Sequence, residues 1–184
     1  SELQRYTEAH RWLAIARGAL GREGDDELPA ELSRVEAFAL ALEGRGKESL
    51  RPAREALAMA ARLFGPQSVR IVRFESTMGS ACRMAGDLAC AEEHHGRDLE
   101  LSSRLLGKTH PRLVSPLTNL GNAAHEGGRH AEAEVYYRRA LAVVESTVGP
   151  NHPDAALAQA GIAKALGAQG NCAAALPVLD RAIG

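Results

Sequence analysis

The chain has 184 residues, with 22 Lys and Arg against 23 Asp and Glu, and 45% of its residues are hydrophobic. A net charge of −1 and an aromatic content of 4% argue against a nucleic-acid binder, which needs a basic surface or aromatic stacking platforms. The apolar content argues against a disordered chain. Good helix formers dominate while β-branched and aromatic residues are few, so we expect an all-α protein.

Hydrophobic periodicity and helix-stop residues predict about nine helices. In chain order we expect them at residues 3–20, 28–43, 48–63, 68–85, 87–106, 111–126, 129–147, 153–168 and 171–183. Pro52, Pro116 and Pro177 fall inside three of these ranges and are expected to kink the helices or delay their starts. The longest uncharged run, residues 165–179, is too short to span a membrane and contains glycine and proline, so we expect no membrane contact.

Three sequence marks recur with one constant 42-residue period. The link Leu106-Gly107-Lys108-Thr109-His110-Pro111 returns as Val148-Gly149-Pro150-Asn151-His152-Pro153. The second mark is Gly44, Gly86, Gly128 and Gly170, and the third is an apolar or small pair at 56–57, 98–99, 140–141 and 182–183. A fixed period of this length indicates a repeat array. We therefore expect one array over residues 1–184. Residues 1–22 are the second helix of a preceding partial repeat, followed by repeats at 23–64, 65–106, 107–148 and 149–184, the last one truncated.

Each repeat is expected to form two helices, each with one apolar face. In the repeat at 107–148 the two faces carry Leu113, Leu117, Leu120, Gly121 and Ala124, then Ala133, Tyr137, Ala140, Leu141 and Val144. The first repeat is the most degenerate, because Val35, Phe38, Ala39 and Leu42 fit the first-helix pattern only after a slip of two residues.

The apolar and small residues of the repeat at 107–148, together with the Leu-Gly-x-x-His-Pro link, resemble the tetratricopeptide repeat in the 42-residue form found in kinesin light chains. The resemblance implies a right-handed superhelical solenoid of antiparallel helix pairs. In the second repeat, Glu75, His95 and Asp98 occupy places that are normally apolar or small, which puts its local packing in question. The Arg-, Ala- and Gly-rich composition is similar in style to arrays that follow the catalytic domain of some large bacterial serine/threonine kinases and regulators.

No residue pattern points to catalysis. Gly107-Lys108-Thr109 resembles the end of a phosphate-binding loop, but Ser102 stands where the upstream glycine is required and no strand precedes it. His110 and His152 recur with the period and are assigned to the inter-repeat loop, where His110 or Thr109 can cap a helix. We therefore expect a non-enzymatic protein with no catalytic residue and no cofactor.

The three cysteines, Cys82, Cys90 and Cys172, show no disulfide-framework spacing. We expect small buried thiols in a reducing, cytoplasmic compartment, and the polar first eleven residues do not resemble a signal peptide. A zinc site at Cys82, Cys90, His94 and His95 is an alternative, but Cys-x7-Cys-x3-His is not a customary ligand spacing. Core and surface roles are the favoured interpretation of these residues.

The remaining functional feature is a surface. In such a solenoid the first helices line a concave wall. The residues that the register turns toward that wall, and that we expect to contact a peptide, are Arg73, Ser76, Thr77, Ser80, Arg83, Thr118, Asn119, Asn122, His125 and Lys164.

The expected function is that of a protein-interaction module that holds a peptide or partner segment. An acidic segment is favoured, because asparagine, serine and arginine side chains suit backbone amides and carboxylates. The alternative is a structural segment whose exposed ends assemble with another copy or with the parent protein.

Overall fold

The computed structural model describes residues 11–16, 18 and 27–183, and within these ranges every regular element is a helix. The chain divides into two compact units, residues 1–94 and 95–184. The all-α class predicted from the sequence is confirmed for the described residues. The expected helix at 3–20 lies largely outside them, although residues 11–16 are helical.

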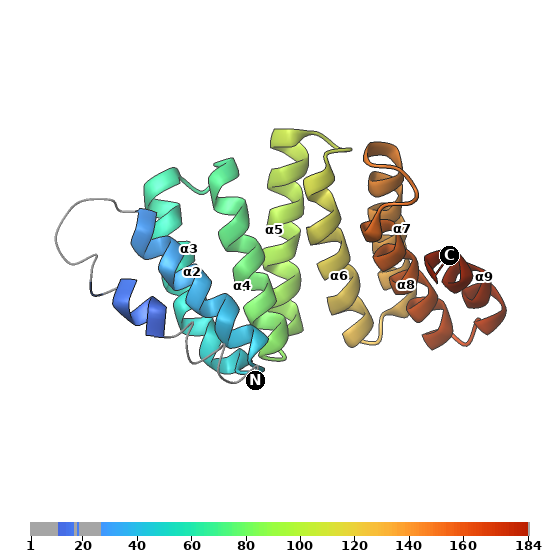
Figure 1. The fold of residues 1–184 in the computed structure, drawn as a ribbon, viewed down its shortest axis with the longest axis horizontal. Coiled ribbons are helices and arrows are strands. Elements are labelled where there is room, and N and C mark those ends of the chain that lie inside the picture. Colours follow the sequence, from blue (N-terminus) through green and yellow to red (C-terminus); the bar gives the residue numbers. More distant parts are fainter. Residues whose placement is uncertain (1–10, 17, 19–26, 184) are drawn as a thin grey trace. The chain divides into compact units, whose positions relative to one another are not determined.

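The first unit contains α2 (Glu27–Leu42), α3 (Gly46–Phe64), the 3-10 turn η1 (Val69–Ile71), α4 (Val72–Met84) and the start of α5 (Leu88–Leu106). The second unit contains the rest of α5, η2 (Pro111–Leu113), α6 (Val114–Glu126), α7 (His130–Thr147), α8 (Pro153–Ala168) and α9 (Cys172–Ile183) (Figure 1).

The helix bounds agree closely with those expected from the sequence. When each 3-10 turn is counted with the helix that follows it, every bound from α2 to α9 lies within two residues of its prediction. Helices α3 and α9 continue through Pro52 and Pro177. Helix α6 starts only after η2, which agrees with the delay expected from Pro116, although α4 has the same 3-10 start without a proline.

Glycines with positive φ follow the ends of the helices from α2 to α8. They are Gly44, Gly65, Gly86, Gly107, Gly128, Gly149 and Gly170, with φ between 75° and 102°. Glycine adopts this left-handed conformation at a helix C-terminus without the steric penalty of a side chain. Neighbouring glycines of this set are separated by half the repeat period throughout, so the turns recur once after each helix.

A side-chain cap is the second feature that recurs with the period, at the start of the first helices. The side chains of Ser68, His110 and His152, each one period after the last, accept hydrogen bonds from the backbone N–H two residues later at 3.1–3.2 Å. Such caps satisfy amide groups that have no partner within the helix. The two histidines thus have a structural role in the inter-repeat loop, as the sequence predicts.

The buried face keeps the 42-residue register in the repeats where it can be compared. Ser33, Glu75, Leu117 and Gln159 are equivalent, and all four are buried. The two-residue slip proposed for the first repeat is wrong, because Val35, Phe38 and Leu42 are 41%, 52% and 59% exposed while Ala37 and Leu40 are buried. Helix α2 packs through small residues and Leu40, while Val35, Phe38 and Leu42 face away from the core.

The second repeat stays packed despite its polar residues, because these groups have partners. The Glu75 carboxylate, which is buried, lies 2.6 Å from Nδ1 of His94. Asp98 accepts a hydrogen bond from the Ser102 hydroxyl at 3.0 Å, and both residues are buried. A buried polar group is tolerated when it is hydrogen-bonded. His95 is also fully buried, in the position that Tyr137 holds in the next repeat.

Tyr137 is the largest fully buried side chain of the second unit and lies between two glycines. A Cβ atom placed on Gly121 of α6 or on Gly161 of α8 would come within 2.7 Å of the Tyr137 ring. The hydroxyl of Tyr137 donates a hydrogen bond to Oδ1 of Asn122 at 2.8 Å. One aromatic ring on α7 therefore sets the approach of both first helices beside it.

Candidate functional site

The first helices of successive hairpins lie side by side within each unit. Helix α2 contacts α4 in the first unit, and α6 contacts α8 in the second. We use "first-helix face" for the side chains of these helices that are not used in packing. The residues predicted for peptide binding belong to α4 (Arg73, Ser76, Thr77, Ser80, Arg83), to α6 (Thr118, Asn119, Asn122, His125) and to α8 (Lys164).

In the first unit an ion-pair network connects α2 with the start of α4. Arg73 lies 2.7 Å from Oε1 of Glu27 and 2.8 Å from Oε1 of Glu31, and Arg70 also pairs with Glu27. Hydrogen bonding from Arg70, and then from Arg73, holds the pKa of Glu27 below its ordinary value. The charge of Arg73 is therefore offset within the face, and an acidic ligand would have to compete with Glu27 and Glu31 for it.

The hydroxyl side chains of α4 are only partly accessible to a ligand on the first-helix face. The Thr77 side chain is buried and donates a hydrogen bond to the carbonyl of Arg73, one turn earlier, at 2.9 Å. Ser76, Ser80 and Arg83 are half-buried. Of the predicted residues on α4, Thr77 is thus committed to its own helix.

Two apolar residues of this face were not predicted. Val35 and Phe38 of α2 stand one period before Thr77 and Ser80, and both are exposed. The unshifted 42-residue register would have assigned them to the face, but the expectation of a slip placed them in the core. The first-helix face of the first unit is therefore apolar on α2 and polar on α4.

In the second unit Asn119 and Asn122 supply amide groups. The Oδ1 atom of Asn122 accepts the Tyr137 hydroxyl, so the amide orientation is fixed and its N–H groups remain for another acceptor. Thr118 and Asn119 are half-buried beside it, and Lys164 is exposed one period after Asn122. These side chains can hydrogen-bond a peptide backbone or a carboxylate.

His125 is the last of the predicted peptide-binding residues on α6 and lies near the end of this helix. Its ring lies 4.8 Å from the ring of His130, and the Nδ1 atoms of both rings are buried without a hydrogen-bond partner in the described structure. Burial, together with the electrostatic effects of the neighbouring Lys164 and His130, lowers the pKa of His125. His125 is consequently neutral at neutral pH.

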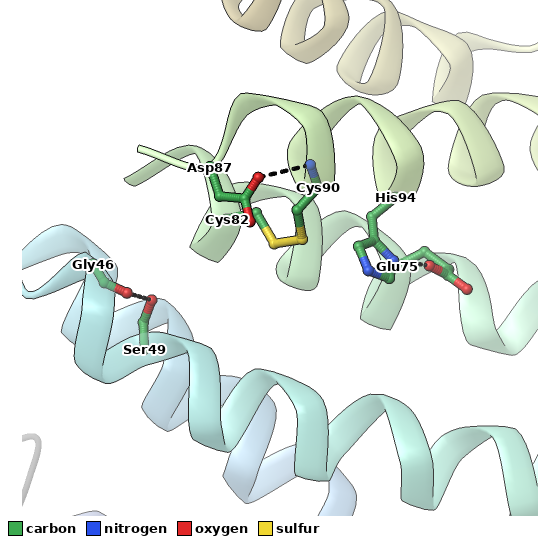
Figure 2. Close-up of a disulfide and its surroundings, with 7 residues drawn as sticks. All are labelled: Gly46, Ser49, Glu75, Cys82, Asp87, Cys90 and His94. Carbon is green, nitrogen blue, oxygen red and sulfur yellow. Dashed lines mark hydrogen bonds and ion pairs between the residues drawn. A yellow bond between two sulfur atoms is a disulfide. The ribbon is translucent and has the colours of Figure 1, made fainter. Parts of the chain in front are cut away.

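The expectation of free, buried thiols is wrong. Cys82, near the end of α4, and Cys90, in the first turn of α5, form a disulfide with a Cα–Cα distance of 5.7 Å (Figure 2), and Cys172 is exposed. The tight turn that contains Gly86, with Asp87 accepting the N–H of Cys90, brings the two cysteines to bonding distance. Their sulfurs are joined and are not available as zinc thiolates. Within the described residues no group of three or more His, Cys, Asp or Glu side chains is placed to hold a metal ion.

Helical hairpins that recur with a fixed period and close through small-residue packing define a helical-repeat protein. The tetratricopeptide repeat profile matches residues 71–146 and 116–184. The chain belongs to the tetratricopeptide repeat family, as its sequence resemblance predicts. No curated protein matches it in sequence.

Solved structures show the same fold at low sequence identity. The chain is similar to BtubC (BKLC) from P. vanneervenii, with 21% identity, a TM-score of 0.80, and coverage of 98% of this chain and 73% of the other. A putative kinesin light chain of Podospora anserina shares 19% identity over 84% and 74% of the two chains, with a TM-score of 0.74. A Rap protein complexed with competence and sporulation factor gives 20% identity and a TM-score of 0.81, and 99% of this chain spans 49% of that one.

The solenoid of antiparallel helix pairs is thereby confirmed as the fold class. Among the described helices, none is both long and apolar enough to cross a membrane.

Proposed function

We propose that the chain is a non-catalytic protein-interaction module that holds a short peptide or partner segment on its first-helix face. The observation that carries the proposal is the fixed amide of Asn122, beside Asn119 and Lys164. Its carbonyl is occupied by Tyr137, and its donors are left for a ligand. The Rap relative, complexed with competence and sporulation factor, supports a partner of this kind.

The ligand proposed is acidic, and the cation we assign to it is Lys164. Arg73 is already paired with Glu27 and Glu31, whereas Lys164 is exposed and forms no ion pair within the described residues. We further propose that the repeats at 23–64, 65–106, 107–148 and 149–184 act as one cytoplasmic module of a larger bacterial regulatory or signalling protein.

Selection from an acidic peptide library against the wild-type chain tests the proposal. Selected peptides should lose at least about tenfold in affinity for an Asn122→Ala/Lys164→Glu variant, since each substitution removes a direct contact. Arg62→Glu, which makes the same change of net charge at an exposed residue of the second helix α3, is the matched control and should bind as the wild type does. Equal binding by all three chains would remove the first-helix face from the proposal.

The disulfide makes the cytoplasmic location testable. Stable disulfides are rare in reducing compartments. Alkylation of the chain in intact cells before lysis should therefore trap Cys82 and Cys90 as free thiols if the location is cytoplasmic. Trapping of a complete disulfide would place the chain in an oxidising compartment.

A second candidate function, assembly with another copy, is favoured by the α8–α9 hairpin. Leu157 and Leu176 are 66% and 62% exposed there, and Leu179, in the register position of Tyr137, is 40% exposed. Light scattering over a range of concentrations measures the assembly directly. A constant monomer mass would exclude it, whereas a dimer abolished by Leu176→Glu would support it.

A further inference from the structure

The second unit contains a cavity of about 440 Å³ that none of the ten predicted peptide-binding residues lines. It is formed by the second half of α5, the loop after Gly107, the start of α6 and the second half of α7. Its size falls within the range of about 300–1,000 Å³ that is usual for small-molecule sites.

The floor of the cavity is apolar. Leu113, Leu117 and Val143 belong to one buried hydrophobic cluster, and Leu99 packs against it from α5. These side chains come from separate helical elements, whose contacts with each other fix the floor. An aliphatic group placed there would be removed from water, which is favourable in proportion to the area it buries.

The rim of the cavity is cationic and hydroxylic. Lys108 and Arg139 line it together with Ser103, Thr109 and Ser146, and no acidic side chain does. Within the described structure neither Lys108 nor Arg139 forms an ion pair, although Arg139 lies over the ring of Tyr136 at 6.0 Å. The Ser146 hydroxyl donates to the carbonyl of Val143 at 3.1 Å and can still accept a hydrogen bond. Two unpaired cations beside hydroxyl donors are the usual recognition set for a carboxylate or a phosphate.

We propose that this cavity binds a small amphipathic anion, with an aliphatic chain on the leucine floor and a carboxylate or phosphate head between Lys108 and Arg139. Lys108 and Thr109, which resemble part of a phosphate-binding loop, line this site. They lie in an inter-repeat turn and would contact the anion through their side chains rather than through backbone N–H groups. It does not depend on the proposed peptide binding, since the two sites share no residue.

Isothermal titration calorimetry of the full chain with four probes tests the site. Octanoate and octyl phosphate carry both features, octanol lacks the charge, and acetate lacks the chain. At least one of the two amphipathic anions should bind at least about tenfold more tightly than octanol and acetate, and the stronger of the two identifies the head group. Absence of saturable binding by both anions, or equal binding of octanol, would overturn the proposal.

Three variants localise the binding of the anion to this cavity. Lys108→Glu/Arg139→Glu changes only exposed side chains and should lower anion affinity by at least about tenfold. Lys47→Glu/Arg54→Glu, which makes the same change of net charge on exposed residues of α3, should leave it unchanged. Ala142→Trp, which fills the cavity without altering its charge, should also weaken binding. Equal affinities for the Lys108→Glu/Arg139→Glu variant and the wild type would refute the site, as would equal losses in both charge variants.

Discussion

At the residue scale, the packing of the second unit depends on the contact of Tyr137 with two glycines. A methyl group on Gly121 or Gly161 would approach ring carbon atoms to 2.7 Å, a distance that requires the ring or a helix to move. The ring is 1% exposed, so protein atoms surround it and its movement would disturb neighbouring side chains. Glycine is therefore needed at these positions for close approach.

Replacing either glycine by alanine should lower the free energy of unfolding by about 1–2 kcal/mol, because overpacking costs more than the gain in helix propensity. Gly96→Ala is the matched control, since a Cβ on Gly96 of α5 would meet nothing within 4 Å, and it should be neutral or stabilising. Urea unfolding followed by circular dichroism measures the three variants. A Gly121→Ala chain as stable as Gly96→Ala would contradict the packing described.

Tyr137→Phe measures the contribution of the hydroxyl to stability apart from that of the ring. It removes the hydroxyl that donates to Asn122, keeps the ring, and should cost about 0.5–1.5 kcal/mol of unfolding free energy. The same variant frees the Asn122 amide, so binding of the peptides selected above should change with it. An unchanged affinity would show that the orientation of Asn122 does not matter for the ligand.

His125 should make stability depend on pH. Its pKa is lowered in the folded chain from an ordinary value of 6.5, so the unfolded chain binds more protons in the window just below that pH. Its contribution is therefore fully present above pH 6.5 and is lost as the pH falls toward the folded pKa.

The drop in unfolding free energy between neutral and mildly acidic pH should be smaller in His125→Asn than in the wild type. Denaturant titrations at several pH values provide the measurement. His110→Asn, which changes a histidine in an inter-repeat cap, is the comparison. An identical pH dependence in His125→Asn and the wild type would contradict the assignment.

At the element scale, helix positions followed from the sequence because their ends are local. A left-handed glycine or a capping side chain stops or starts a helix through contacts within a few residues, and the 42-residue period repeats these signals. Two features of the helices could not be predicted from the sequence. The pairing of Cys82 with Cys90 depends on how sharply α4 turns into α5, which residue spacing alone does not reveal. The face of α2 was misassigned because Val35 and Phe38 are larger than the alanines that are actually buried.

For the residues of the candidate site, the helix on which each lies could be predicted from the sequence, but the ion pairs among them could not. The period places Asn119, Asn122 and Lys164 on one face, and the structure has them on α6 and α8. That Glu27 and Glu31 pair with Arg73 could not be read from the pattern, because these residues belong to different repeats and meet only when α2 contacts α4.

The disulfide closes a short loop across the α4–α5 turn. Reduction should lower the unfolding free energy by about 2.5 kcal/mol, by the loop-entropy relation for a loop of about eight residues. A Cys82→Ala/Cys90→Ala chain should show no response to reductant. A wild-type transition that also ignores reductant would indicate that the bond does not form or does not stabilise the hairpin.

At the scale of the whole molecule, described contacts are confined to helices one or two places apart in the chain. Stability in such arrays is a sum of nearest-neighbour terms, so regions with fewer neighbours open first. Helix α9 contacts α8 alone among the described helices, whereas α7 contacts α6 and α8.

Amide hydrogen exchange should therefore be faster in α9 than in α7. The measurement is native-state exchange read by mass spectrometry on peptides that cover 130–147 and 172–183. Equal protection in the two helices would show that the array unfolds as one cooperative block.

The glycine turns and the caps follow different intervals, because the turns come twice in each period and the caps once. Recombination that adds or removes one whole period would leave the glycine turns and the Ser or His caps in phase, so only buried positions that differ between repeats, such as His95 and Tyr137, would meet new neighbours. A half-period change would preserve the turns but place a second helix where a first helix with its Ser or His cap belongs. Gene duplication in this chain should therefore be tolerated in whole hairpins and selected against in single helices.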